Sequence, residues 1–470
     1  MFERKIKGTI NNWIENGKDA FLLRGIRQVG KTYIIRECLK ESSYPFVELN
    51  FIEHPELVEL LNNSINTNDF IMRLSLTTTE KLVPYKTIFF LDEVQECKDI
   101  ITKIKFLVED GRYKFILSGS LLGVEINDLR SAPVGYMSVH DMYPLCFEEF
   151  SKALGIKQDI IDLLKDCFDN RKAVDGFVHK KMMDLFYLYL IIGGMPEAVM
   201  TYIDTNDLSM VSAVHKKILD LYRIDFTKYE NNYKLKIREI FDSIPGQLNQ
   251  MNKRFKFSII SKNVSYDRLE NSFLWLKDAG VAIPVYNVSE PTVPLIISKN
   301  RSLFKLFYGD VGLLTSNYSN DVKIAILNKN PSINNGALFE NACAQELLCK
   351  NFKLYYFNSK KQGELDFVVE YKGKVLPIEI KSGKSYKKHS ALNNVLSNDD
   401  YMIDEGFVFY DDNIKVKNNK VYFPIYMLMF LDNTISQEFI YKIDWLNIND
   451  IFSFHWNFRL CSLKGDIDNE

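Results

Sequence analysis

The chain lacks the cysteine pairs and the histidine spacing that mark metal-binding modules. Its seven cysteines are scattered without a C-x-x-C pair, and its six histidines show no ligand spacing. This pattern argues against a disulfide framework and against a structural zinc site, and it fits a reducing, cytoplasmic compartment. No run approaches the roughly 18 apolar residues of a membrane span. Because the first residues also lack an apolar signal core, we expect no membrane partner.

An excess of charge of one sign is also absent. The formal net charge is −2, from 59 basic and 61 acidic residues, which argues against polyanion binding by the whole surface but leaves local basic patches open. The hydrophobic content of 46% is ordinary for a globular protein with a sizeable core. A length of 470 residues predicts two to four domains.

The clearest signal present is the segment Gly25-Ile26-Arg27-Gln28-Val29-Gly30-Lys31-Thr32, which matches the phosphate-binding pattern G-x-x-x-x-G-K-[ST]. The glycines let the backbone curl, so that amide groups can point at a phosphate where the next helix begins. In such loops the lysine reaches the β- and γ-phosphates and the hydroxyl binds Mg²⁺. An apolar run at 20–23 predicts a strand before the loop. We therefore expect the loop and Tyr33 to bind nucleotide.

Further strands are predicted at 46–50 and at 87–91, and the second of these ends in Asp92 and Glu93. Two carboxylates at the end of a buried strand favour a metal site, with Asp92 in the Mg²⁺ shell and Glu93 acting on the attacking water. The alternative is that they cap the next helix. A strand at 113–117 ends in Ser118, our candidate to sense the γ-phosphate. Alternating strands and helices predict a doubly wound parallel α/β sheet with its ligand at the strand C-termini.

Several segments together carry a family resemblance. GIRQVGKT, FFLDEVQ, ILSGSLLG and MYPLCFEEF, in this order, resemble the AAA-type P-loop ATPases of archaea and bacteria that carry a conserved C-terminal domain of unknown function. The likeness continues through YLIIGGMPEAV, FKLFYGDVGLL and GELDFVV…PIEIKSG. It implies ATP and Mg²⁺ as cofactors. Relatives usually carry a basic residue where Tyr136 stands, so Arg130 becomes a substitute candidate for an arginine finger, with a solvated surface arginine as the alternative.

The middle of the chain changes character near residue 233. Residues 145–230 are helical in pattern, and the resemblance makes them the ATPase lid. Between 234 and 268 there are eight basic and three acidic residues, and two helices followed by a strand at 281–286 suggest a winged helix. Such a module could read DNA in the major groove. The alternative is internal packing, since Phe273 and Leu276 already occupy much of the second helix.

The C-terminal part carries the pattern of a nuclease fold. Two strands around the hairpin at 372–373 bear Asp366, Glu379 and Lys381, the D…E-x-K arrangement of the PD-(D/E)xK restriction-endonuclease fold. There the two carboxylates hold Mg²⁺ and the lysine acts on the water. Glu340 lies on the apolar face of a predicted helix, where a metal shared with Asp366 would offset the cost of burying its charge.

These signals divide the chain into a P-loop ATPase core (1–150), a helical lid (151–232), a winged-helix-like domain (233–325) and a nuclease-like domain with an extension (326–470). From 350 to 390, ten lysines and four acids give a local charge of +6, with Lys384, Lys387 and Lys388 as candidates for a phosphate-facing rim; a solvated face is the alternative. The leading hypothesis is an Mg²⁺-dependent switch that binds and hydrolyses ATP and is coupled to a DNA-binding, nuclease-like C-terminal module. The alternative is a nucleotide-gated protein- or DNA-interaction module without nuclease activity, and a homo-oligomer or protein partner stays open.

Overall fold

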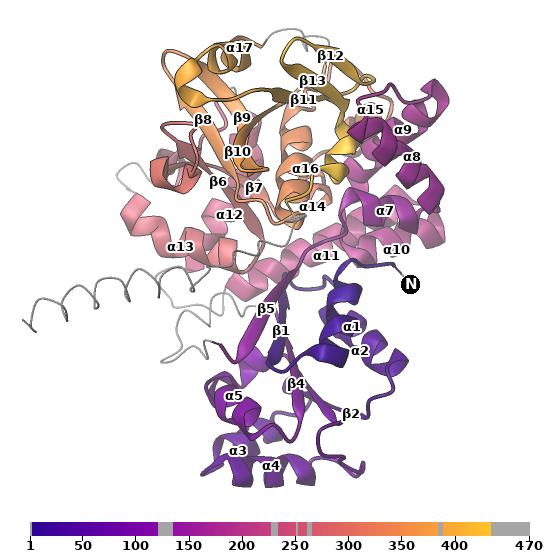
Figure 1. Cartoon of the computed structure of the whole chain (residues 1–470), viewed down its shortest axis with the longest axis vertical. Helices are drawn as coiled ribbons and strands as arrows, with labels where there is room; N and C mark the ends of the chain where they lie inside the picture. The colour runs from indigo at the N-terminus through magenta and orange to yellow at the C-terminus, as the bar shows by residue number, and fades with distance from the viewer. Residues whose placement is uncertain are drawn as a thin grey trace, which may run out of the picture. The chain divides into compact units, whose positions relative to one another are not determined.

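The computed structural model covers the whole chain and describes residues 2–120, 135–226, 234–250, 252–260, 266–383 and 389–433 (Figure 1). The finger candidate Arg130 and the rim candidates Lys384, Lys387 and Lys388 lie outside these residues. The described residues up to Asp432 form one compact unit.

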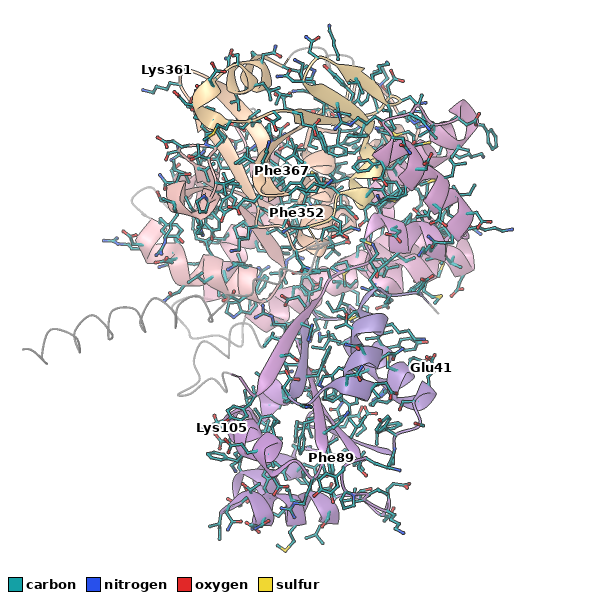
Figure 2. All side chains as sticks on the ribbon, in the orientation of Figure 1. Glu41, Phe89, Lys105, Phe352, Lys361 and Phe367 are labelled. Atoms are coloured by element: carbon teal, nitrogen blue, oxygen red, sulfur yellow. The ribbon has the colours of Figure 1, made fainter. Side chains whose placement is uncertain are left out.

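Five parallel strands form the N-terminal sheet, in the order β2-β3-β4-β1-β5. Side chains of β1 alternate: Phe21 and Leu23 pack with helices α1 and α2, whereas Ala20 and Leu22 pack with α3, α4 and α5 on the opposite face (Figure 1). Figure 2 shows Phe89 of β3 in the interior of this part of the chain. The predicted doubly wound α/β core is confirmed. The strands are β1 Ala20–Gly25, β2 Phe46–Asn50, β3 Ile88–Asp92, β4 Lys114–Gly119 and β5 Met137–Met142; the helices are α1 Ile6–Asn16, α2 Lys31–Glu41, α3 Glu56–Asn62, α4 Thr67–Leu76, a 3₁₀ turn Val94–Glu96 and α5 Lys98–Asp110.

A helical segment follows, and it is interrupted at Gly193 and Gly194. Gly193 has a φ of 70°, and a Cβ there would come within 2.1 Å of Asp310 Oδ1. The backbone N–H of Gly194 donates to Asp310 Oδ2 at 2.6 Å, and Pro196 begins the next helix, where its missing N–H costs nothing. The break therefore admits a buried carboxylate. The helices are α7 Phe147–Ala153, α8 Gln158–Asp169, α9 Gly176–Ile192, α10 Pro196–Thr205, α11 Leu208–Phe226 and α12 Lys234–Leu248.

Within the described ranges, no single helix has the length and apolar character needed to cross a membrane. The bent pair α9 and α10 meets the test of length and composition only when its two halves are taken together.

Eight strands form the second sheet, in the order β12-β13-β11-β10-β9-β8-β6-β7. The β6–β7 hairpin, which follows the two helices of the predicted winged helix, joins the C-terminal strands through parallel pairing of β6 with β8. The segments 233–325 and 326–470 thus share one sheet. Its elements are a 3₁₀ turn Phe257–Ile259, α13 Tyr266–Asp278, β6 Ala282–Val288, a 3₁₀ turn Leu295–Ser298, β7 Lys299–Tyr308, α14 Val311–Thr315, α15 Asn320–Leu327, α16 Gly336–Cys349, β8 Tyr355–Ser359, β9 Gly363–Tyr371, β10 Lys374–Ile380, α17 Ser390–Leu396, a 3₁₀ turn Asp399–Tyr401, β11 Gly406–Tyr410, β12 Lys415–Lys417, β13 Lys420–Pro424 and a 3₁₀ helix Ile425–Phe430.

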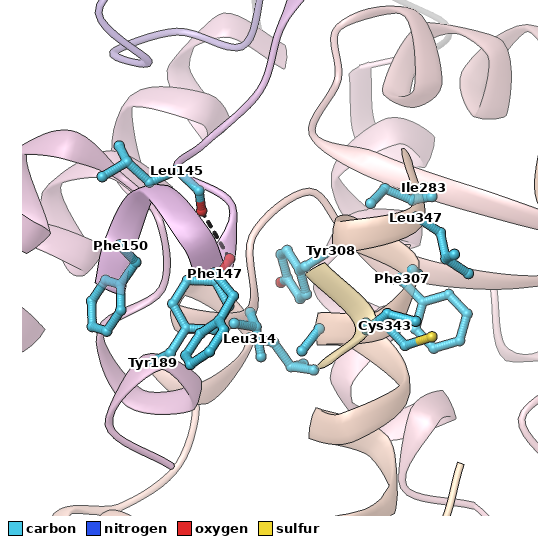
Figure 3. Packing of buried hydrophobic residues seen from close by; sticks show 14 of the residues in the cluster. Leu145, Phe147, Phe150, Tyr189, Ile283, Phe307, Tyr308, Leu314, Cys343 and Leu347 are labelled. Atoms are coloured by element: carbon cyan, nitrogen blue, oxygen red, sulfur yellow. Dashed lines mark hydrogen bonds between the residues drawn. The ribbon is translucent and has the colours of Figure 1, made fainter. Parts of the chain in front are cut away.

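One continuous apolar core joins the helical segment to the second sheet (Figure 3). Tyr189 of α9 packs edge-on against Phe147, and its hydroxyl donates to the carbonyl of Leu145 at 2.9 Å. Cys343 of α16 and Phe307 of β7 belong to the same cluster. Every residue of α16 from 337 to 347 is buried, as expected of a helix that is enclosed on all sides. This enclosure carries the polar residues of α16 into the interior.

A candidate nucleotide site and a lysine-rich carboxylate cluster

The phosphate-binding loop connects β1 to α2. Gly30 has a φ of 95° and lies immediately before the first residue of α2, Lys31. A Cβ on Gly25 would come within 2.2 Å of the carbonyl oxygen of Met142, at the end of β5. Both glycines are therefore required by the local backbone. Strand, loop and helix follow one another in the order that the sequence predicts.

Lys31 is buried beneath this loop. Its ammonium donates to the carbonyl oxygens of Gly25 at 2.9 Å and Ile26 at 3.1 Å. Burial lowers the pKa of Lys31 to about 8, although Glu93 and Asp92 act in the opposite direction. A phosphate group at the loop would give this poorly solvated ammonium an anionic partner.

Asp92 ends β3 as a buried carboxylate surrounded by hydrogen-bond donors. Thr32 Oγ1 lies 3.1 and 3.0 Å from its two oxygens, Asn50 Nδ2 donates to Oδ2 at 3.1 Å, and the Ser118 hydroxyl donates to Oδ1. Burial raises the pKa of Asp92, while the hydrogen bonds from Ser118 and Thr32 oppose the rise. The structure thus brings Thr32, Asp92 and Ser118 together, as hard oxygen donors of the kind that suits Mg²⁺. Asn50 was missed from the sequence; its signal is its position at the carboxyl end of the neighbouring strand.

Glu93 has a left-handed backbone, with a φ of 56°, and its side chain is half-buried. It makes no side-chain capping bond to the 3₁₀ turn that follows; instead it accepts a hydrogen bond from Gln95 Nε2. Glu93 therefore does not cap the helical turn that follows it, as the alternative proposed. Tyr136 donates its hydroxyl to Glu109 at 2.7 Å.

The loop also contacts helix α11. Arg27, between the two loop glycines, forms an ion pair of 2.6 Å with Asp225, whose side chain is 3% exposed. The Tyr222 hydroxyl lies 3.5 Å from the carbonyl oxygen of Arg27. A Cβ on Gly280, after α13, would come within 2.5 Å of Ile26. Sequence reasoning placed Arg27 in the loop but did not find Asp225, because nothing in the sequence pairs residues 198 positions apart.

These contacts can be compared with known proteins. Residues 17–151 match the model of an AAA domain. Residues 183–322 and 335–428 match two domains of unknown function, DUF8612 and DUF4143. No curated protein sequence matches the chain significantly. The AAA match and the loop geometry together support a P-loop ATPase domain in the N-terminal part.

Solved structures give remote similarities. The Walker-type ATPase PABY2304 of Pyrococcus abyssi is 15% identical, with coverage of 67% of this chain and 95% of that chain and a TM-score of 0.40. The Aeropyrum pernix ORC1 protein in complex with DNA is 12% identical, with coverages of 70% and 93% and a TM-score of 0.27. Cdc6p from Pyrobaculum aerophilum is 14% identical, with coverages of 69% and 94% and a TM-score of 0.24. Similarity at this level carries no conclusion about function.

A second group of charged side chains, which we call the C-terminal cluster, lies where α16 meets β7, β9 and β10. The ammonium of Lys305 on β7 is 1% exposed and lies 2.7 Å from Glu364, 3.8 Å from Glu340 and 4.0 Å from Asp366. Lys253 forms an ion pair with the other oxygen of Glu340. Burial alone would lower the pKa of Lys305, but the three carboxylates raise it. A lysine thus stands among the carboxylates that the sequence assigns to a metal.

The remaining predicted residues of this cluster are also paired. Glu379 Oε2 lies 3.0 Å from Lys381 Nζ and 2.9 Å from Nδ1 of the buried His389. Asp366 Oδ2 accepts the backbone N–H of Ile380 at 2.8 Å. Neither His389 nor Lys305 was found from the sequence, although a single lysine between Phe304 and Leu306 in an apolar strand is a usable signal.

The carboxylates predicted to bind metal are Glu340, Asp366 and Glu379, and their surroundings do not fit a divalent cation. Among the residues that the structure describes, no three His, Cys, Asp or Glu side chains are grouped so that they could hold a metal ion. Burial, and then the neighbouring Asp366, raise the pKa of Glu340, while Lys253 and Lys305 lower it. The structure balances this cluster with lysines, and we derive no metal chemistry from it.

Proposed function

We propose that the chain is an Mg²⁺-dependent ATP-hydrolysing switch. The observation that carries the proposal is the contact of Thr32 with Asp92 beside a buried Lys31, within a segment that matches an AAA domain. In this assignment the loop from Gly25 to Tyr33 binds the phosphates, and Thr32 and Asp92 would hold Mg²⁺. When bound, the ion neutralises charge on the β- and γ-phosphate oxygens.

The chain's own residues then have separate roles in hydrolysis. Lys31 exchanges its two carbonyl acceptors for phosphate oxygens, which supply the charge partner that the carbonyls lack. Glu93, held by Gln95 at the end of β3, orients or deprotonates the attacking water. Ser118 holds the carboxylate of Asp92 in place and senses the γ-phosphate from the end of the neighbouring strand.

The pair formed by Arg27 and Asp225 offers a route from the nucleotide to the helical lid. A guanidinium binds phosphate oxygens as well as it binds a carboxylate, so nucleotide phosphates compete with Asp225 for Arg27. Because Asp225 lies on α11, this competition changes how α11 is held against the loop. ATP binding would thus reorient the lid, and the parts of the chain that follow it.

For the C-terminal part, we propose DNA binding without cleavage, the second of the two functions considered above. Exposed lysines supply the positive charge for phosphate contacts; they are Lys353, Lys360, Lys361 and Lys372, and Figure 2 shows Lys361 projecting away from the ribbon. The pairing of Lys305 and Lys253 with the acidic cluster favours binding over nuclease chemistry. If the gel shift described below detects no binding to DNA, a protein partner in place of DNA is the remaining alternative.

Phosphate release by the purified protein tests the ATPase. Wild type with Mg²⁺ and ATP should release phosphate, and Lys31→Ala and Glu93→Gln should reduce the rate by at least about 10²-fold, as expected when a charge or base acting in the transition state is lost. Lys105→Ala, which removes a half-exposed lysine of α5 outside the loop, serves as the matched control. Equal release by wild type and Lys31→Ala would contradict the proposal.

A gel shift and a plasmid assay test the DNA part. Binding should weaken steeply as salt rises, because phosphate contacts release counterions, and the charge reversals Lys360→Glu and Lys361→Glu should weaken it further. Supercoiled plasmid with Mn²⁺ and ATP should stay intact. Nicking that disappears in Asp366→Ala would overturn the assignment of binding without cleavage, and salt-independent retention would point to a contact other than phosphate.

A further inference from the structure

Lys305 serves as an internal counter-ion for the carboxylates of the C-terminal cluster. Its ammonium lies within 4.0 Å of carboxylates from two elements, Glu340 on α16 and both Glu364 and Asp366 on β9. The lysine reaches them from a third element, β7, with 1% of its side chain exposed. Charges withdrawn from water in this way must be compensated by one another, so Lys305 acts electrostatically as a bound cation would.

The rest of the cluster is balanced in the same manner. Lys253 forms an ion pair with Glu340, and Lys381 lies 3.0 Å from Glu379. Four carboxylates face three ammonium groups, which leaves a formal charge of −1 before His389 is considered. A divalent cation would add two positive charges to a cluster whose formal charge is only −1. It would also have to displace a buried ammonium from its partners, so binding would gain little free energy.

The same lysine also connects β7 with α16 and β9 through its ion pairs. Lys305 and its neighbour Phe304 lie on the strand that pairs with β6 in the second sheet, and the cluster ties that strand to α16 and β9. Because Lys305 links β7, α16 and β9 through ion pairs, we expect it to stabilise the folded structure. This contribution is independent of any reaction at the carboxylates.

We propose that Lys305 is the permanent cation of the C-terminal cluster, so that this site takes up a divalent metal only when the charge of Lys305 is removed. The inference deepens the proposed binding of DNA without cleavage, on which its consequence for function rests. It does not depend on nucleotide, because neither ATP nor the P-loop takes part.

The experiment compares the thermal stability of nucleotide-free, full-length variants in EDTA and in millimolar Mn²⁺. Wild type and Asp366→Asn should respond to Mn²⁺ equally, since any metal bound elsewhere is common to both. Lys305→Met should melt at a lower temperature in EDTA and gain more from Mn²⁺ than wild type does. That additional gain should disappear in Lys305→Met combined with Asp366→Asn. Lys305→Arg, which keeps the charge, should behave like wild type in Mn²⁺.

Lys299→Met provides a matched control on the same strand, because the Lys299 ammonium lies over the ring of Tyr286, outside the cluster. It should show no additional response to Mn²⁺. A stronger Mn²⁺ response in wild type than in Asp366→Asn would overturn the proposal, as would a folded Lys305→Met without additional response. If Lys305→Met does not fold, the alternative experiment is a calorimetric titration of Mn²⁺ into wild type and into Asp366→Asn. Equal binding heats for the two proteins support the proposal. A Mn²⁺ site that is present in wild type and absent in Asp366→Asn contradicts it. Phosphate release remains a separate readout.

Discussion

At the scale of single residues, the pair formed by Arg27 and Asp225 is the most informative contact outside the loop itself. One partner belongs to the phosphate-binding loop and the other is a buried carboxylate on α11, 2.6 Å away. Buried charge pairs are costly to break from one side only. We therefore expect the contact between Arg27 and Asp225 to contribute to the stability of the folded chain.

A double-mutant cycle tests this expectation. Arg27→Ala and Asp225→Asn should each lower the free energy of unfolding, and their interaction energy without nucleotide should be about 0.5–3 kcal/mol, as for residues in direct contact. With saturating Mg²⁺-ATP the interaction energy should fall, because phosphate competes for Arg27. Denaturant midpoints of the four proteins, with and without ATP, give both values. An interaction energy that ATP leaves unchanged would contradict the proposed route to the lid.

Some functional residues could be predicted from the sequence and others could not. Lys31, Thr32 and Asp92 were predicted, because a glycine-rich loop and a strand ending in acids are local patterns with a fixed chemistry. Lys305, Lys253, His389 and Asp225 were not predicted, because their partners lie far away along the chain and no local period signals a buried ion pair. Glu340 was placed correctly on a buried face, but the cation beside it is a lysine, whereas the sequence had suggested a metal.

At the scale of elements, the break between α9 and α10 shows how one carboxylate organises several segments. Asp310 is fully buried, accepts the N–H of Gly194, and also accepts the N–H of Leu313 in the first turn of α14. Gln345 of α16 donates to it at 3.3 Å. Helices α9, α10, α14 and α16 therefore meet around this side chain.

Gly193→Ala tests the packing at this break. The φ of 70° and the approach of 2.1 Å to Asp310 leave no room for a Cβ, so we expect a loss of about 1–3 kcal/mol in the free energy of unfolding. Gly246→Ala is the matched control: this glycine lies within α12, and a Cβ added there would have no atom within 4 Å. It should be stabilising by about 0.4–1 kcal/mol. Equal effects of the two substitutions on the urea midpoint would contradict this description.

Asp310 also predicts a dependence of stability on pH. Burial raises the pKa of Asp310 from 3.8 to about 6, against the opposing hydrogen bonds from Gly194 and Leu313. The folded state therefore binds the proton more tightly than the unfolded state. The cost of the buried charge is absent below about pH 4, grows as the pH rises toward about 6, and is complete above it. The stability of wild type relative to Asp310→Asn should thus be greater at about pH 4.5 than at about pH 7.5. A difference that is constant with pH would show that this carboxyl does not titrate in that range.

The β6–β7 hairpin was predicted only in part from the sequence. Two helices followed by a strand at 281–286 were predicted, and α12, α13 and β6 follow in that order, with β7 after them. Their membership in an eight-stranded sheet was not predicted, because β6 pairs with β8, a strand that comes much later in the chain. The proposed winged helix therefore has its strands committed to another partner, and α13 buries Phe273 and Leu276.

At the scale of the whole molecule, the N-terminal and C-terminal parts differ in how their buried charges are balanced. The first depends on an external ligand, because the hydrogen bonds of the buried Lys31 ammonium go to the carbonyl oxygens of Gly25 and Ile26, which carry no formal charge. The second carries its own cations. We therefore expect ATP with Mg²⁺ to raise the melting temperature by mass action, and we expect this rise to be lost in Lys31→Ala and kept in Lys305→Arg.

The most direct test of the central claim is a calorimetric titration of ATP, in the presence of Mg²⁺, into wild type and into Lys31→Ala combined with Thr32→Ala. We expect saturable binding of one ATP by wild type and no measurable binding by the double variant. Absence of ATP uptake by wild type, or equal uptake by both proteins, would contradict it.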